Sequence, residues 1–424
     1  AGAWCGQNKY LSAIKNAFQN FMPLTIAGAI GVLWCNVLVS DQTGLGLFFK
    51  PIMALDFLNP AFQAVNFCTI SCITVGITLG IAQEIGVWNM GAEKAGYIPG
   101  LVGLAAWLSV TNTSHMVEGA KEAFTGIAGN ELGATGLFTG MIIGVLSVEL
   151  FCFFEKQDAL KIKMPEQVPP GVARAFEVLV PATITLIITA CIGSACYNLT
   201  GLYLNDVIKN GIQGPLGAVG ATIPGVMIIY LVIMLFWLVG IHGNNMLSAV
   251  KEALFTPLAL ENVEKFNKGE KPTNIINMYA LQMWGEFGGS GVTIGLVIAI
   301  MIFGKREDNK AIATLSLVPG LFNINETVTF GIPMVLNPIL GIPFVVAPLI
   351  TIIIGYVLTV IGFCPVACLT VPWTTPPIVF GFLACGANVM GAVTQAILIV
   401  VSTVIYVPFL ISYEKYQNKQ AAEA

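Results

Sequence analysis

The chain has 424 residues, of which 56% are hydrophobic and 10% are charged, and its net charge at pH 7 is −4. Soluble domains carry roughly 25% charged residues, so the composition excludes an ordinary soluble domain and predicts an all-α polytopic membrane protein. The sequence has no basic cluster with interleaved aromatic residues, which argues against nucleic acid as a partner.

Four apolar segments precede the first long hydrophilic stretch of the chain and predict membrane-spanning helices. An amphipathic stretch, residues 8–20, leads into the first of them. We expect the four spans at residues 21–40, 64–83, 97–109 and 135–154.

The hydrophilic stretch that follows, residues 155–177, carries the basic residues Lys156, Lys161, Lys163 and Arg174. Because cytoplasmic loops carry an excess of basic residues, we expect this loop in the cytoplasm and, with four spans before it, the N-terminus there as well. Its prolines stiffen it, which suits a docking surface in which Lys161, Lys163 and Arg174 contact a cytoplasmic partner. An ordinary positive anchor at the membrane surface is the alternative, and it stays open.

After residue 177, apolar spans alternate with polar or broken segments. Residues 247–284 carry many charges, so we expect most of them to be solvated. Segments 311–338 and 370–384 are apolar but interrupted by prolines, which predicts broken, re-entrant helices in the C-terminal half. In total, about ten segments cross or enter the membrane. The expected spans are residues 178–197, 219–241, 288–303, 342–363 and 389–411.

Glu326 is the only Asp, Glu, Lys or Arg between Lys310 and Glu414. A carboxylate at membrane depth costs roughly 2.5–3.5 kcal/mol on insertion scales. We therefore expect Glu326 to face a cavity and to meet a partner there. An exposed loop between two helices is the alternative.

The residues around Glu326 support a site. Asn323 and Asn325 add hydrogen-bonding groups, and Pro319 and Pro333 interrupt the helix on either side. Broken segments with polar side chains at membrane depth are typical of a transporter's substrate site.

A second uncharged run extends from residue 210 to residue 250 and contains His242. The sequence around it, GIHGNN, includes Asn245 and two glycines, which indicates a helix that opens into a polar cavity. An interfacial histidine whose ring is satisfied by backbone groups is the alternative.

Sugars are bound by carboxylates and amides that pair with hydroxyls, and by an aromatic face that stacks on the ring. The candidates for such a site are His242, Asn245, Asn323, Asn325, Glu326 and Trp373. The second hypothesis is a proton-coupled secondary sugar symporter, which would need Glu326 but fewer amide side chains. A third, a membrane scaffold without transport, does not account for the set of polar residues at membrane depth. No Walker-type phosphate loop is present, and no CxxC pair recurs at metal spacing, so we expect neither a cofactor nor a metal.

Five segments carry a family resemblance: residues 163–181 (KMPEQVPPGVARAFEVLVP), 240–245 (GIHGNN), 288–296 (GGSGVTIGL), 320–339 (GLFNINETVTFGIPMVLNPI) and 372–377 (PWTTPP). In this order they resemble the membrane-spanning IIC components of sugar phosphotransferase systems, in the lactose/cellobiose/diacetylchitobiose branch. The resemblance covers nearly the whole chain.

The resemblance implies a multi-pass homodimer in the bacterial cytoplasmic membrane. Residues 1–200 would supply the dimer interface, and residues 201–424 would bind and carry the sugar. The substrate would be a β-linked disaccharide such as cellobiose, diacetylchitobiose or lactose.

The resemblance also implies the chemistry. A separate IIB protein, docked at the loop of residues 155–177, would transfer a phosphoryl group from its phosphocysteine to the 6-hydroxyl of the sugar. The chain would thus be the membrane subunit of a protein-phosphocysteine–sugar phosphotransferase. Glu326 would be its catalytic residue and would hold the hydroxyl together with His242. Asn323 and Asn325 would line the pocket, and Trp373 would belong to the facing loop.

Overall fold

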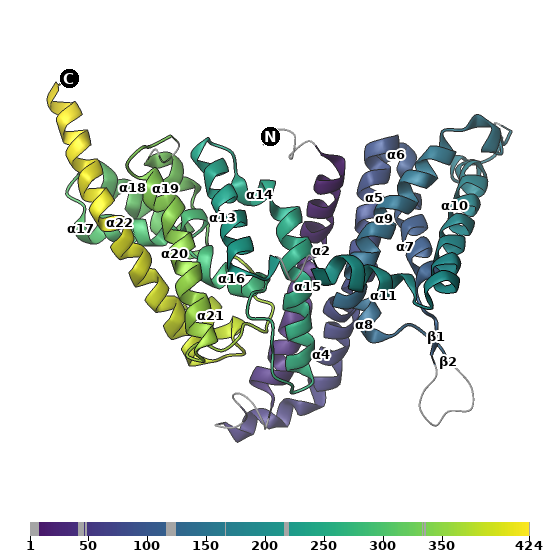
Figure 1. The fold of residues 1–424 in the computed structure, drawn as a ribbon, viewed down its shortest axis with the longest axis horizontal. Helices are drawn as coiled ribbons and strands as arrows, with labels where there is room; N and C mark the ends of the chain where they lie inside the picture. The colour runs from purple at the N-terminus through teal and green to yellow at the C-terminus, as the bar shows by residue number, and fades with distance from the viewer. Residues whose placement is uncertain are drawn as a thin grey trace. The chain divides into compact units, whose positions relative to one another are not determined.

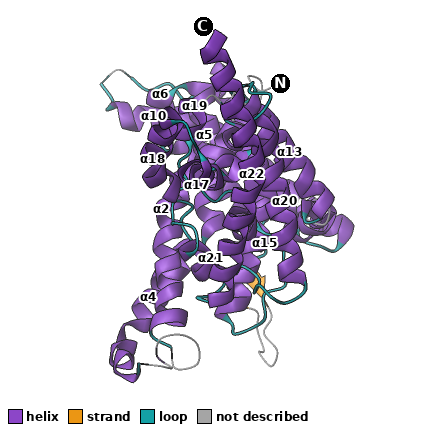
Figure 2. Ribbon diagram, turned by 90° about the vertical axis from the view of Figure 1, so that its left-hand side faces the viewer, coloured by secondary structure: helices purple, strands orange, loops and turns teal. Residues whose placement is uncertain are grey.

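The protein is described by a computed structural model that covers residues 8–40, 46, 49–115, 124–165, 167–215, 220–332, 334 and 336–423. Helices make up nearly all of the regular structure in these ranges (Figures 1 and 2). The exception among the described residues is one short antiparallel pair, β1 (Ser114–His115) with β2 (Phe124–Thr125). The prediction of an all-α protein is confirmed.

The helices follow the apolar segments of the sequence, and labels with η denote 3-10 or π helices. Up to residue 215 they are α2 (Lys9–Leu33), η1 (Trp34–Leu38), η2 (Lys50–Leu58), α4 (Asn59–Asn66), η3 (Phe67–Ser71), α5 (Ile73–Met90), α6 (Ala92–Ala95), α7 (Ile98–Val110), α8 (Gly129–Leu132), α9 (Ala134–Glu155), η4 (Asp158–Leu160), α10 (Pro170–Thr200), α11 (Leu204–Ile208) and η5 (Lys209–Gln213).

The remaining helices are α13 (Ile223–Leu238), α14 (Gly243–Met246), α15 (Ser248–Asn267), α16 (Met278–Gly285), η6 (Ser290–Val292), α17 (Ile294–Phe303), α18 (Glu307–Leu321), α19 (Glu326–Gly331), α20 (Gly341–Val360), α21 (Val379–Ala384) and α22 (Val389–Glu423). Val219, the first residue of one expected span, lies outside the described residues, as does Pro333.

Five helices within the described residues are long and apolar enough to cross a membrane, and two bent helix pairs raise the number to seven if each pair is one span. The expected number of about ten is not confirmed by length and composition. The shortfall arises where helices are short or broken. The pair formed by Met278–Val292 and Ile294–Phe303 bends by 60°, and α19 and α21 are single short helices within the segments expected to be broken.

The chain folds into two compact units that interleave along the sequence. One, here called the α5–α10 unit, contains residues 3–28 and 65–217; the other, the α13–α22 unit, contains residues 1–2, 29–64 and 218–424. The roles expected for residues 1–200 and 201–424 stay predictions.

Close helix packing builds the α5–α10 unit, in which α5, α7, α9 and α10 pack against one another (Figure 1). A Cβ atom added at Gly140 of α9 would lie 2.2 Å from the Thr78 hydroxyl oxygen of α5. Small residues at such positions let helix backbones approach closely in membranes. Trp107 of α7, almost fully buried, packs into a cluster with Val110 and Ile143.

Polar contacts place several helix ends of the α5–α10 unit together. The Lys9 ammonium group at the start of α2 pairs with Glu149 of α9 at 2.5 Å and donates to Asn89 near the end of α5. Arg174 at the start of α10 pairs with Glu155 at the end of α9. The start of α2 and the loop of residues 155–177 therefore share one end of this unit, as an even number of crossings between them requires.

The α13–α22 unit buries α16 almost completely, against α20, α21 and α22. The expectation that residues 247–284 are mostly solvated is wrong for α16 and for one face of α15. Charged side chains of α15 such as Glu261 are exposed, but Phe255 and even Lys251 are buried. Charge density along the sequence did not reveal this face because Lys251 is paired with a residue distant in sequence, Glu286.

Candidate functional site

The helix breaks where the sequence predicts it. Helix α18 contains Pro319 and ends at Leu321, and α19 begins at Glu326. Between them, Asn323 adopts a left-handed backbone conformation with φ of 62°. Asn is among the few residues other than Gly that enter this region readily. The turn places Glu326 at the start of α19.

The side chains of Asn323 and Asn325 tie this turn to two other segments. The Asn323 amide oxygen accepts a hydrogen bond from the backbone N–H of Gly288 at 2.6 Å, and its nitrogen donates to the carbonyl oxygens of Trp373 and Thr375. The Asn325 amide nitrogen donates to the Ser290 carbonyl oxygen at 2.7 Å. Both amides thus position the backbone of the site; direct contact with a ligand stays a prediction for them.

His242 and Glu326 face each other. The distance from His242 Nε2 to Glu326 Oε1 is 3.8 Å, and the two side chains are 38% and 48% exposed. This distance is too long for a direct hydrogen bond. The pair is open to solvent, so a third polar group can approach both members from the exposed side.

The backbone selects one tautomer of His242. Its Nδ1 accepts a hydrogen bond from the backbone N–H of Asn245 at 3.2 Å, so the proton of the neutral ring is on Nε2, the nitrogen that faces Glu326. The indole ring of Trp237 lies against the imidazole, with ring centroids 4.4 Å apart. The ring is thus held from two sides, with a donor directed toward an acceptor.

Trp373 and Asn245 lie at the edges of this arrangement. Trp373 is 44% exposed, and its backbone carbonyl oxygen accepts a hydrogen bond from Asn323, three residues before Glu326. Asn245 is exposed and follows His242 in the turn of α14. Hydrogen bonds thus join Asn323 to the loop of Trp373, whereas His242 and Glu326 face each other without a direct hydrogen bond.

A largely buried ion pair beside the site was not predicted from the sequence. Lys251 of α15 forms an ion pair with Glu286, which directly follows α16, and the Tyr230 hydroxyl donates to the same carboxylate at 2.7 Å. A signal was present, because Glu286 is the only charged residue between Lys271 and Lys305. This is the criterion that singled out Glu326.

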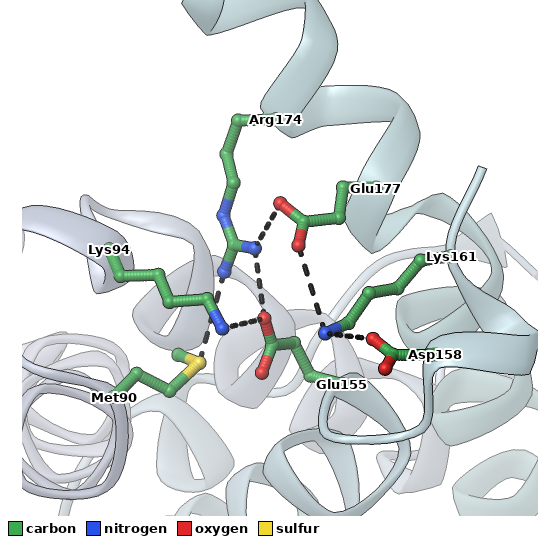
Figure 3. Close-up of polar contacts among 7 residues, drawn as sticks. All are labelled: Met90, Lys94, Glu155, Asp158, Lys161, Arg174 and Glu177. Atoms are coloured by element: carbon green, nitrogen blue, oxygen red, sulfur yellow. Dashed lines mark hydrogen bonds and ion pairs between the residues drawn. The ribbon is translucent and has the colours of Figure 1, made fainter. Parts of the chain in front are cut away.

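Two of the three residues expected to dock a partner are engaged within the chain (Figure 3). Arg174 pairs with Glu155 at 2.9 Å and with Glu177 at 2.7 Å, and Lys161 lies 3.2 Å from Asp158 and 3.9 Å from Glu177. Lys163, in contrast, is exposed. Partner contacts of all three residues stay a prediction. Lys163 is the best placed of the three to contact a partner, because its side chain is exposed.

A helical chain with several membrane-length helices and a polar site at broken helices is an integral membrane protein of the transporter class. The family model described as "Phosphotransferase system, EIIC" matches residues 15–348. The chain belongs to this family and is a sugar permease of the phosphotransferase system. The family resemblance inferred from sequence motifs is confirmed.

Relatives match along the whole chain. The oligo-beta-mannoside-specific EIIC component of Bacillus subtilis is 33% identical over 96% of this chain and 90% of its own length. The cellobiose-specific EIIC component of Lactococcus lactis is 30% identical over 98% and 96%. The crystal structure of ChbC, the IIC component of an N,N'-diacetylchitobiose-specific phosphotransferase system, matches with a TM-score of 0.90 and 29% identity over 99% of this chain and 97% of that one.

Proposed function

We propose that this permease carries a β-linked disaccharide across the bacterial cytoplasmic membrane, coupled to phosphorylation of the sugar's 6-hydroxyl by a separate IIB protein. Relatives named for oligo-beta-mannosides, cellobiose and diacetylchitobiose support the substrate class. The observation that carries the mechanism is the facing pair of His242 and Glu326, 3.8 Å apart and half-exposed at a break between helices.

A sugar hydroxyl can bridge these two groups from their exposed side. At a typical hydrogen-bond length of about 2.8 Å from each, its oxygen would accept from His242 Nε2–H and donate its own proton to the Glu326 carboxylate. When that oxygen attacks the phosphorus of the donor phosphocysteine, the phosphorus–sulfur bond breaks and Glu326 takes the proton. Phosphoryl transfer requires mainly such positioning.

The experiment uses the purified protein in vesicles with a panel of β-linked disaccharides and a phosphorylated IIB protein. We expect sugar to accumulate inside as the 6-phosphate, and only when IIB is present. Accumulation of unmodified sugar together with protons would instead establish the symporter, which no observation in the described residues favours.

The homodimer is part of the same proposal, with the interface supplied by residues 1–200. Large apolar side chains of α10, including Leu179, Ile187 and Ile192, are exposed on the single chain and need lipid or a second copy to cover them. Single cysteines at these positions should cross-link between two chains in the membrane if the second copy covers them, and should fail to do so if lipid covers them.

Replacing Trp373 by Ala should weaken disaccharide binding. Loss of an aromatic face that stacks on a ring costs about 1–3 kcal/mol where bases stack on aromatic side chains, and a sugar ring offers a comparable apolar face, so we expect affinity to fall roughly tenfold. Equilibrium binding to purified protein measures this. Trp88→Ala, an exposed tryptophan of α5, is the matched control, and equal affinity in the parent and the Trp373 variant would contradict the assignment.

The loop of residues 155–177 should be accessible from the cytoplasm. Gln167 is exposed in this loop, so a Gln167→Cys variant should react with a membrane-impermeant thiol reagent only in inside-out vesicles. Labelling confined to intact cells would overturn the proposed orientation.

A Lys163→Glu change should weaken IIB binding without affecting sugar binding, if this face docks the partner.

A further inference from the structure

We infer that Lys251 and Glu286 are positioning residues for the sugar site: their buried ion pair holds Asn244 and Ser290, and through them the turn that carries Glu326. The inference rests on the proposed function and deepens it, because it names residues that shape the site without touching the substrate.

The ion pair joins three helices of the α13–α22 unit. Lys251 lies in the first turns of α15 and is 5% exposed. Its ammonium group contacts the Glu286 carboxylate and lies 5.4 Å from the centre of the Tyr230 ring of α13. The Tyr230 hydroxyl donates to the same carboxylate oxygen at 2.7 Å. The fully buried side chain of Tyr230 therefore covers one side of the ion pair.

On its other side the pair continues into the site through direct hydrogen bonds. Lys251 Nζ donates to the Asn244 amide oxygen at 3.3 Å, and the Asn244 nitrogen donates to the Ser290 hydroxyl at 2.8 Å. The Ser290 carbonyl oxygen accepts from the Asn325 amide at 2.7 Å. Asn325 directly precedes Glu326, and Asn244 lies two residues after His242.

The hydrogen bonds therefore end at Asn325, next to Glu326, and pass through Asn244, in the turn that begins at His242. A shift of Asn244 would move the turn that His242 caps, and a shift of Ser290 would move the turn at Asn325. This set of hydrogen bonds acts beside those of Asn323 and the packing of Trp237 on His242, and we infer that it helps to fix the distance between His242 Nε2 and Glu326 Oε1.

Energetics favours a positioning role over a purely stabilising one. The desolvation penalty of two buried charges offsets most of their Coulombic attraction. Replacing a whole buried pair by apolar residues is therefore often neutral for stability. An apolar pair would lack the ammonium group of Lys251, which donates a hydrogen bond to the Asn244 amide oxygen. The Asn244 amide would lose that partner, and its orientation toward Ser290 would no longer be selected.

The test compares two variants with a control. Lys251→Met leaves Glu286 without its cation, whereas the double change Lys251→Met with Glu286→Gln removes both charges at nearly constant volume. Lys268→Met is the matched control, because Lys268 borders the same helix but forms an exposed pair with Glu264 at 2.6 Å. Three quantities are measured: the thermal unfolding midpoint, backbone hydrogen exchange of peptides covering residues 240–246 and 322–329 without sugar, and disaccharide affinity.

We expect Lys251→Met to lower the unfolding midpoint and the double variant to recover most of that loss. Both should nevertheless exchange faster in the two site peptides, and both should bind sugar about tenfold more weakly, in the range seen when contacts along a coupling network are removed. Lys268→Met should match the parent in all three measurements.

The double variant decides between the roles. If its site peptides exchange at the parent rate and its affinity is unchanged, the pair is structural only and the inference is wrong. Faster exchange of every peptide in the protein, or the same response in Lys268→Met, would also overturn it. If the parent binds none of the disaccharides, the proposed function fails; exchange in the site peptides still decides the positioning claim.

Discussion

Replacing Glu326 by Gln should lower disaccharide affinity by roughly one to two orders of magnitude. The change keeps the shape of the side chain but removes the charged acceptor that faces His242 across 3.8 Å. A hydrogen bond to a charged group is roughly twice as strong as a neutral one, and a poorly paired buried hydroxyl costs about 1–3 kcal/mol. Equilibrium binding of the disaccharide to purified protein measures the loss.

Phosphorylation should fall further than binding, because the side-chain amide of the Glu326→Gln variant cannot take the proton of the attacking hydroxyl. The rate is measured with phosphorylated IIB at sugar concentrations that saturate each protein. Glu264→Gln changes a half-exposed carboxylate of α15; it is the matched control and should behave as the parent. A Glu326→Gln protein that binds and phosphorylates normally would remove Glu326 from the site, whereas a symporter would keep sugar binding and lose its coupling to protons.

The position of single ionisable residues in long apolar runs was enough to predict the centre of the candidate site. Glu326 is the one charged residue in a long uncharged stretch, and His242 stands in another. Because a lone polar group at membrane depth needs a partner, Glu326 could be expected to meet one; only the family resemblance paired it with His242, and the structure places the two face to face. The break at residues 322–325 was also predictable from Pro319 and the two asparagines around Glu326.

The supporting contacts could not be predicted in the same way. Lys251 lies among the charges of α15, and its burial depends on Glu286, which local charge density does not connect to it. Arg174 and Lys161 read as free cations in a loop, yet Glu155 and Glu177 neutralise them. Pairing between residues distant in sequence is a tertiary property, and so is the depth to which a broken helix enters the membrane.

The same ion pairs predict a large effect on stability in the α5–α10 unit. Glu155 is 1% exposed and accepts contacts from Arg174 at 2.9 Å and from Lys94 at 2.8 Å (Figure 3). Breaking a buried ion pair by removing one partner costs about 3–5 kcal/mol. We expect Glu155→Gln to destabilise the protein near the lower end of that range, because Arg174 keeps Glu177 and Lys94 is partly exposed.

Chemical or thermal unfolding in detergent measures this loss, with Asp158→Asn as the matched control. Asp158 belongs to the same network but is 80% exposed, so its pair with Lys161 should contribute only about 0–1 kcal/mol. Sugar affinity, measured where both variants are folded, should stay at the parent value, since every proposed sugar contact lies in the α13–α22 unit. If Glu155→Gln had the same free energy of unfolding as the parent, these ion pairs would not hold the loop of residues 155–177 in place. Arg174 and Lys161 would then be available to a partner, as predicted from the sequence.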